Sequence, residues 1–188
     1  MKELLPKLAI TLFIVGAIAA AALGFTYAVT NKRIALEDKQ AEAKASIAAI
    51  PSLKSPSELK AEPQLTAAAK KKVPEVSKIY SSSKGDIIII EGKGYGGVLE
   101  NAVGISPDGK VIAVSNISNK ETAGLGSKTL EPAFLDKFKG KSINDKLKVG
   151  EDIQAVTGAT ISSTAMTGQV KEALEAYKII TGGSGGAN

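Results

Sequence analysis

The residues best suited to chemistry are eight near the end of the chain, Thr157 to Thr164, which read Thr-Gly-Ala-Thr-Ile-Ser-Ser-Thr. An apolar-periodic run from Ala165 to Ile180 follows, and hydroxyl residues before such a run are typical of a helix start. A helix start presents unpaired backbone N–H groups and the positive end of a dipole. Glycine lets a phosphate approach the backbone, and hydroxyls add donors. The segment is therefore a candidate seat for a phosphorylated ligand; the alternative is an ordinary helix cap without a ligand.

The composition excludes several kinds of site. Cysteine and histidine are both absent, which excludes disulfides, thiol nucleophiles and iron–sulfur ligation. The same absence removes the common zinc ligands and the usual general base near neutral pH. Redox chemistry on this chain would need an organic cofactor. The net charge of +5 is mild and tryptophan is absent, so we predict no nucleic-acid partner and interpret the lysine run at 70–72 as a solvated face or linker.

The N-terminal part predicts a membrane anchor. No charged residue lies between Lys7 and Lys32, and Leu8 to Val29 forms an apolar stretch of about 22 residues, roughly 33 Å long as a helix. A cleaved signal peptide is the alternative, with Ala20 to Ala22 as a small-residue cleavage site, but the stretch is longer than a typical signal core. The charges on its two sides are nearly balanced, so orientation does not follow from charge alone.

We predict four parts: residues 1–32 as a tail and transmembrane helix, 33–73 as a helical, proline-containing stalk, 74–181 as a compact domain, and 182–188 as a flexible tail. Within the stalk, 33–50 has helix-forming composition, and a short helical piece is expected at 65–72. Three strands are expected at 86–91, 98–106 and 110–117, with Pro107-Asp108-Gly109 as the turn between the last two. A meander of this kind makes adjacent strands antiparallel.

The rest of the domain supplies loops and helices. Residues 121–128 lack a clean period and read as a loop, 131–138 as a short helix with Pro132 early, and 152–156 as a brief strand that leads into the hydroxyl-rich segment. A helix then runs to about residue 180. The expected fold class is α+β: one N-terminal transmembrane helix, then a small domain with an antiparallel sheet and packed helices.

Three segments together resemble one family. They are Gly94-Tyr95-Gly96-Gly97, the six residues from Glu121 to Gly126, and Thr157-Gly158-Ala159-Thr160. With a single N-terminal span, this arrangement resembles the FMN-binding domain of membrane redox complexes, above all the G subunits of Rnf-type ion-translocating oxidoreductases. The related C subunit of the Na⁺-translocating NADH:quinone reductase shares the pattern but is usually longer.

The resemblance implies a covalent cofactor. In this family FMN is joined through its phosphate to the last threonine of the Thr-Gly-Ala-Thr motif, which is Thr160 here, while Thr157, Gly158 and Ala159 would shape the turn around the phosphate. A separate flavin transferase makes the ester, so Thr160 is a modification site and no catalytic residue is expected. One position departs from the family: Gln154 stands where the pattern usually has Asp, and Asp152 lies two residues earlier.

The resemblance also implies that the loop lies against the isoalloxazine and ribityl groups. The residues expected there are Glu121, Thr122, Gly124, Leu125 and Gly126, and Lys128 could place a positive charge near the flavin or be simply solvated. For Gly94 to Gly97, a structural turn and a wall of the cofactor site both remain open.

The implied function is electron relay within a ferredoxin:NAD⁺ oxidoreductase complex that moves Na⁺ or H⁺ in other, polytopic subunits. The chain would be a single-pass protein of the cell membrane with its domain extracytoplasmic, with other membrane and peripheral subunits as partners, no metal and no independent catalysis. One alternative is an FMN-carrying chain of a related system, either the C subunit of the quinone reductase or a component of another extracytoplasmic electron-transfer pathway. Another is an anchored, non-redox domain that binds some other anion.

Overall fold

The computed structural model describes residues 4–182, and these fall into two compact units, one up to Gln40 and one from Ala41 onward. The first three residues and the predicted tail beyond residue 182 lie outside the described part. The long helix α1 (Leu4–Ala49) begins in the first unit and ends in the second. The predicted helical composition of 33–50 is therefore confirmed.

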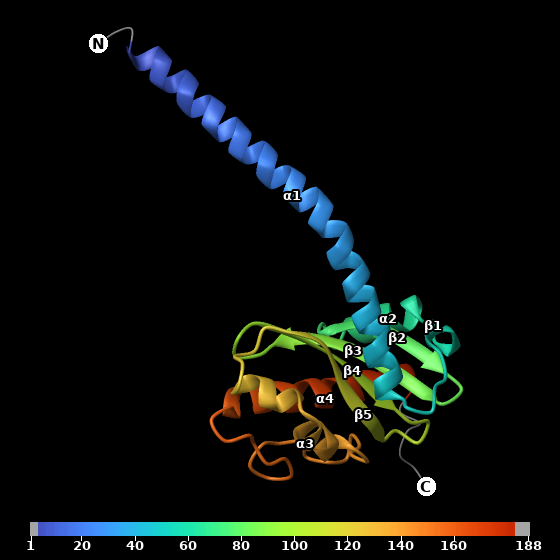
Figure 1. The fold of residues 1–188 in the computed structure, drawn as a ribbon. Coiled ribbons are helices and arrows are strands. Elements are labelled where there is room, and N and C mark those ends of the chain that lie inside the picture. Colours follow the sequence, from blue (N-terminus) through green and yellow to red (C-terminus); the bar gives the residue numbers. More distant parts are fainter. Residues whose placement is uncertain (1–3, 183–188) are drawn as a thin grey trace. The chain divides into compact units, whose positions relative to one another are not determined.

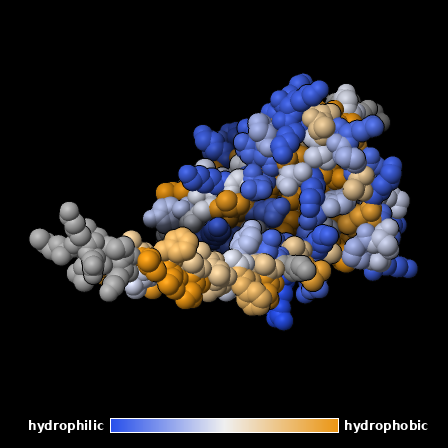
Figure 2. Space-filling model, turned by 90° about the horizontal axis from the view of Figure 1, so that it is seen from above, coloured by the Kyte–Doolittle hydropathy of each residue, from blue (hydrophilic) through white to orange (hydrophobic). Residues whose placement is uncertain are grey.

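The first unit is an exposed apolar helix. Large side chains such as Leu12, Phe13, Leu23 and Phe25 are all more than 70% exposed. Figure 2 shows apolar side chains along this helix and mainly hydrophilic ones on the surface of the compact unit. The helix is long and apolar enough to cross a membrane, because a bilayer core needs about 20 apolar residues.

The second unit is built on one sheet of five antiparallel strands in sequence order (Figure 1). The strands are β1 (Lys60–Ala61), β2 (Val76–Ser82), β3 (Gly85–Lys93), β4 (Val98–Ile105) and β5 (Val111–Asn119). The three predicted strands correspond to β3, β4 and β5, and their antiparallel pairing is confirmed. The sequence did not predict β1, which is very short, or β2, whose serines and lysine mask its alternation.

The helices are short apart from α1 and α4. They are α2 (Pro63–Lys70), α3 (Pro132–Leu135), α4 (Thr160–Ile180) and the 3₁₀ turns η1 (Pro56–Glu58), η2 (Gly126–Leu130) and η3 (Asp136–Phe138). The helix expected at 131–138 is present as α3 and η3, and α2 covers most of the one expected at 65–72. The strand expected at 152–156 is wrong: Ile153 makes one isolated bridge, to Val149, because the chain folds back on itself there.

Both faces of the sheet are covered. Ile88 and Ile90 of β3 belong to the larger core cluster, with α3, η3 and α4, whereas Ile87 and Ile89 belong to a smaller cluster with Ala45, Ala49, Ile50 and Leu53. The compact unit thus begins at Ala41 and not at the expected residue 74. The physical reason is that the small side chains near the end of α1 pack closely on the sheet, where a Cβ at Gly104 would collide with the carbonyl oxygen of Ala49.

Candidate functional site

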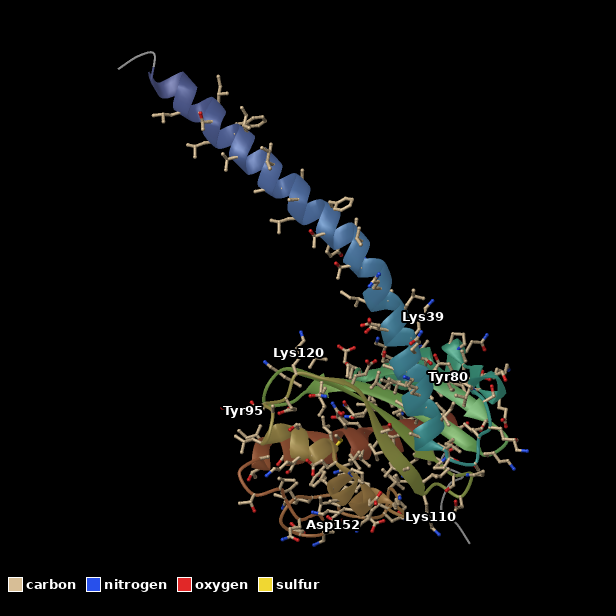
Figure 3. The ribbon with its side chains drawn as sticks, in the orientation of Figure 1. Lys39, Tyr80, Tyr95, Lys110, Lys120 and Asp152 are labelled. Atoms are coloured by element: carbon tan, nitrogen blue, oxygen red, sulfur yellow. The ribbon has the colours of Figure 1, made fainter. Side chains whose placement is uncertain are left out.

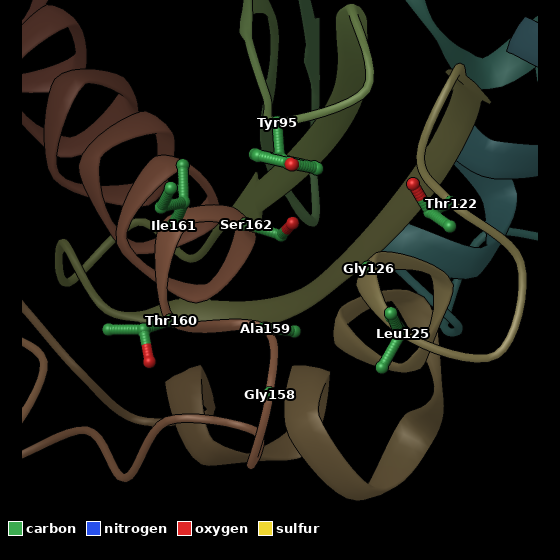
Figure 4. Close-up of a pocket in the computed structure, with 9 residues that line it drawn as sticks. All are labelled: Tyr95, Thr122, Leu125, Gly126, Gly158, Ala159, Thr160, Ile161 and Ser162. Atoms are coloured by element: carbon green, nitrogen blue, oxygen red, sulfur yellow. The ribbon is translucent and has the colours of Figure 1, made fainter.

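A pocket of about 350 Å³ opens at the N-terminal end of α4, within the range of roughly 300–1,000 Å³ usual for small-molecule sites. Three segments far apart in the sequence form it: the β3–β4 turn, the loop that leads into η2, and the turn that leads into α4. None of the lining residues is charged. They are Tyr95, Thr122, Leu125, Gly126, Gly158, Ala159, Thr160, Ile161 and Ser162 (Figure 4).

The start of α4 is not capped by a side chain. Thr160 is the first helical residue, five positions before the run that predicted the helix, and Ala159 occupies the cap position without a side-chain hydrogen bond. Gly158 has φ +78°, a conformation that favours glycine. The first N–H groups of a helix have no partner within the helix. The backbone donors at 160–162 therefore stay available beside the pocket, and no side chain caps the helix at Ala159.

The hydroxyl groups of residues 157–164 differ in whether they make hydrogen bonds. Ser162 donates to the Glu121 carboxylate (2.8 Å), the Ser163 Oγ accepts the N–H of Val156 (3.0 Å), and Thr164 donates to the carbonyl of Thr160 (2.9 Å). Thr160 is exposed, and among the described residues none makes a hydrogen bond with its hydroxyl. It therefore combines an unengaged oxygen with a place in the pocket wall.

Thr157 is the other exposed threonine of the motif, but it does not line the pocket. Ser162, Ser163 and Thr164 already use their hydroxyls in hydrogen bonds. Among the hydroxyl residues from 157 to 164, Thr160 is therefore the one whose oxygen a ligand in the pocket could reach without displacing a protein hydrogen bond.

Glu121 lies behind the pocket wall. Its Oε1 accepts the N–H of Tyr95 (2.8 Å) and its Oε2 accepts the hydroxyl of Ser162 (2.8 Å). A Cβ at Gly94 or at Gly126 would collide with one of these oxygens. The sequence placed Glu121 beside the cofactor; the structure places its carboxylate between the segments that surround the pocket.

The other predicted residues divide into two sets. Among the described residues, those that line the pocket are Thr122, Leu125, Gly126, Gly158, Ala159 and Thr160, whereas Thr157, Glu121, Gly124 and Lys128 do not line it. Gly124, with φ +78°, makes the turn of the loop, and its N–H donates to Ser127 Oγ. Lys128 is exposed on η2.

Sequence reasoning missed Ile161 and Ser162 as lining residues and left Tyr95 open. The available signal was the helix start itself, because the residues after Thr160 belong to its first turn. Tyr95, Leu125 and Ile161 are 67%, 49% and 60% exposed. Their side chains offer an apolar surface that a flat aromatic ring could cover, beside backbone donors that suit a phosphate. The residues present therefore fit a flavin nucleotide.

Asp152, the acidic residue nearest to the position that departs from the family pattern, is engaged within its own loop. Its carboxylate accepts the backbone N–H of Lys148 (2.8 Å) and of Leu147 (3.0 Å) and pairs with Lys141 (3.2 Å). These hydrogen bonds hold the pKa of Asp152 below its usual value. Asp152 and Tyr95 lie apart in Figure 3. Gln154, which stands at the departing position, is exposed.

Comparison with known proteins agrees with this geometry. The profile of the FMN-binding domain matches residues 94–175. The chain is 31% identical over 189 residues to the G subunit of the Na(+)-translocating ferredoxin:NAD(+) oxidoreductase complex of Acetobacterium woodii, covering 92% of this chain and 91% of that protein. The chain belongs to the G-subunit family of ion-translocating oxidoreductase complexes.

This G-subunit family member is similar to two further proteins. It is 44% identical over 115 residues to the G subunit of the proton-translocating ferredoxin:NAD(+) oxidoreductase complex of Clostridium ljungdahlii, a match that covers 55% of this chain and only 62% of the relative. A solved structure of the C subunit of the Na(+)-translocating NADH-quinone reductase from Parabacteroides distasonis superposes with a TM-score of 0.54 at 19% identity, covering 84% of this chain and 98% of that one. The second similarity shows a shared fold.

Proposed function

We propose that this chain carries FMN as a phosphoester on Thr160 and relays electrons within a ferredoxin:NAD⁺ oxidoreductase complex that translocates Na⁺ or H⁺. The observation that carries the proposal is the unengaged, exposed Thr160 hydroxyl in the wall of the pocket, in a chain that belongs to an FMN-binding family. The chain has no cysteine or histidine, so its redox capacity has to come from a bound organic group.

The residues around the pocket divide the work of binding. Backbone N–H groups at the start of α4, with the dipole of that helix, would hold the phosphate. The exposed faces of Tyr95, Leu125 and Ile161 would cover the ring and keep water from it. When bound, FMN supplies one- and two-electron redox chemistry. The described residues contain no cluster of acidic side chains fit for a metal ion, and we expect no independent catalysis by this subunit.

Attachment requires a second protein. The new bond joins Thr160 Oγ to the flavin phosphorus, the hydroxyl proton is lost, and the leaving group comes from a flavin nucleotide activated at its phosphate. We propose that a separate flavin transferase supplies this step. The exposed turn at 157–158, separated from Thr160 by one residue, would let such an enzyme approach.

The deciding experiment is the intact mass of the full chain, purified from a host that contains the transferase. We expect one added FMN phosphoester that survives denaturation, its loss in Thr160→Ala, and its retention in the matched control Thr164→Ala, since Thr164 is exposed and does not line the pocket. A chain of unmodified mass, or a Thr160→Ala variant that keeps denaturation-resistant flavin, would overturn the proposal.

We further propose that the compact unit is extracytoplasmic and that its partners are other membrane and peripheral subunits of the same complex. Because the chain has no cysteine, Ser83→Cys, at an exposed turn, can be labelled selectively with a membrane-impermeant maleimide. Labelling of intact cells would support the orientation, and labelling only after lysis would contradict it.

Co-purification separates this function from a role in another extracytoplasmic pathway. Polytopic subunits and a ferredoxin:NAD⁺ activity should purify with the tagged chain. If quinone reductase activity is recovered in place of ferredoxin:NAD⁺ activity, the related system is the correct one.

A further inference from the structure

One carboxylate connects all three segments that form the pocket. Glu121 itself belongs to the loop before η2, its Oε1 binds the N–H of Tyr95 in the β3–β4 turn, and its Oε2 binds the hydroxyl of Ser162 in the first turn of α4. Each oxygen thus serves a different segment, and the two donors are separated from Glu121 in the sequence by 26 and 41 residues. Hydrogen bonds to an ionised acceptor are stronger than neutral ones.

The space around this carboxylate is closely fitted. A Cβ at Gly94 would collide with Oε1, and a Cβ at Gly126 would collide with Oε2. Neither glycine has a positive φ, so backbone conformation does not require glycine at these two positions. A Cβ at either position would instead displace the Glu121 carboxylate, which links the glycines at 94 and 126 to the same side chain.

The backbone of Glu121 is held as well. Its N–H donates to Asn119 Oδ1 (3.2 Å), Asn119 Nδ2 donates to Asn116 Oδ1 (3.0 Å), and Asn116 Nδ2 donates to Asn101 Oδ1 (2.9 Å). Asn101 in turn donates to Gln169 of α4. Asn101 and Gln169 are fully or almost fully buried, and buried amides are seldom kept without a complete set of partners.

This chain of amide hydrogen bonds ends on α4, the same helix whose Ser162 donates to the Glu121 carboxylate. Ser162 and Gln169 are seven residues apart on α4, which places them on one face of the helix about two turns from each other. The loop that carries Glu121 is therefore fastened to α4 at two points, once by a charge and once by a chain of amides. Two such points restrict the movement of the loop relative to the helix more than either contact would alone.

We propose that Glu121 is a positioning residue that holds the three walls of the pocket, and thereby the apolar faces that flank the flavin, in one arrangement. The proposal rests on the pocket being the FMN site. Glu121 does not touch the pocket; it acts through Tyr95 and Ser162, both of which line it. A carboxylate offers two acceptor oxygens, one for each of these donors, whereas a neutral amide of the same shape offers one acceptor oxygen.

The chemistry of substitution follows from the two donors. The N–H of Tyr95 can only donate, whereas the hydroxyl of Ser162 can also accept. In Glu121→Gln the amide oxygen can keep the first contact and the amide N–H₂ can donate to Ser162, so partial rescue is expected. In Glu121→Ala both donors lose their partner.

The test is hydrogen–deuterium exchange on the full chain in detergent, produced in a host without the flavin transferase and shown by intact mass and absorbance to carry no flavin. We expect Glu121→Ala to speed exchange about tenfold or more in the segments 94–97 and 122–127, with Glu121→Gln in between. The matched control is Glu175→Ala, an exposed glutamate of α4, which should leave these rates unchanged. Unchanged exchange at Tyr95, or an equal increase throughout β3, β4 and β5, would overturn the proposal.

A second measurement uses the FMN-loaded chain. With Glu121→Ala, the visible absorbance and circular dichroism of the flavin should change, and Glu121→Gln should restore them in part. An unchanged flavin spectrum despite faster exchange in the pocket walls would also overturn the proposal. The exchange experiment is done without FMN, so a failure of the proposed attachment appears in the mass measurement and does not affect it.

Discussion

The two faces of the sheet are packed in opposite ways. The face toward α4 is filled by large side chains, among them Phe134 and Phe138, whose rings meet edge to face at 5.5 Å. On the face toward the end of α1, the small side chains of Ala45, Ala49 and Ala102 let the helix lie close to the sheet, and the larger Ile50, Leu53, Ile87 and Ile89 pack beside them. The first face packs against α4, whose first residues line the pocket, and the second packs against the end of α1.

This difference implies opposite sensitivities. A core of large side chains is weakened when volume is removed, because a cavity remains. A close contact between small residues is weakened when volume is added, because the backbones must separate. Substitutions that remove volume should therefore destabilise the face toward α4 and the pocket, and substitutions that add volume should destabilise the face toward α1.

Removing volume on the pocket side should have the largest effect. Phe138 is fully buried, and Phe138→Ala should lower the free energy of unfolding by about 3–5 kcal/mol, measured by urea unfolding of the full chain in detergent. Phe138→Leu fills most of the space and should lower it by less. If both variants unfold like the wild-type protein, the large-residue core does not carry the stability of this face.

Adding volume on the α1 side should have a smaller but specific effect. In Gly104→Ala the new Cβ meets the carbonyl oxygen of Ala49, and we expect a loss of about 1–3 kcal/mol. Gly168→Ala in α4 is the control, since nothing lies within 4 Å of a Cβ there, and alanine in a helix should stabilise by about 0.5–1 kcal/mol. If both variants are destabilised, or neither is, the face toward α1 is not selectively sensitive to added volume. Flavin attachment should survive in both variants.

The polar contact at the edge of the α1 side should have the smallest effect. Glu42 accepts the hydroxyl of Tyr80 (2.6 Å) and pairs with Lys78 (2.6 Å), and Tyr80→Phe should lower the free energy of unfolding by about 1 kcal/mol. Burial, with the hydrogen bond to Glu42 and its charge, raises the pKa of Tyr80 from 10.0 to about 12.

The pH dependence of this contact follows from that shift. Because the folded pKa is the higher one, the contribution is present below about pH 10 and is lost as the pH rises toward about 12. The difference in stability between the wild-type protein and Tyr80→Phe should therefore shrink over this range. A difference that stays constant up to pH 12 would show that folding does not raise the pKa of Tyr80.

Local patterns predicted β3, β4 and β5 but missed β1 and β2 at the other side of the sheet. The isoleucine run at 87–90 and the turn at 107–109 identify three strands because each is a strong signal within a few residues. All four isoleucines are buried, since both faces of β3 are covered. The partner on the second face is the end of α1, whose alanines have the composition of a solvated helix, and nothing local distinguishes the two roles.

The candidate site was predicted in part for a similar reason. Thr160, Gly158 and Leu125 were found because their motifs are contiguous in the sequence. Glu121 was predicted as a contact of the cofactor, yet its carboxylate binds Tyr95 and Ser162. That role depends on segments far apart in the chain, and sequence spacing carries no information about which of them meet.

The place of Thr160 at the first position of α4 has a further consequence. The helix behind it is anchored in the core through Met166, Val170, Ala173 and Leu174, all of which are almost completely buried. A group attached there is mounted on a rigid support and does not swing on a flexible arm, as carrier groups on long side chains do. The distance over which electrons tunnel to a donor or acceptor would then be set by how the whole protein docks on its partner. Motion of a side chain that carries the group would contribute little.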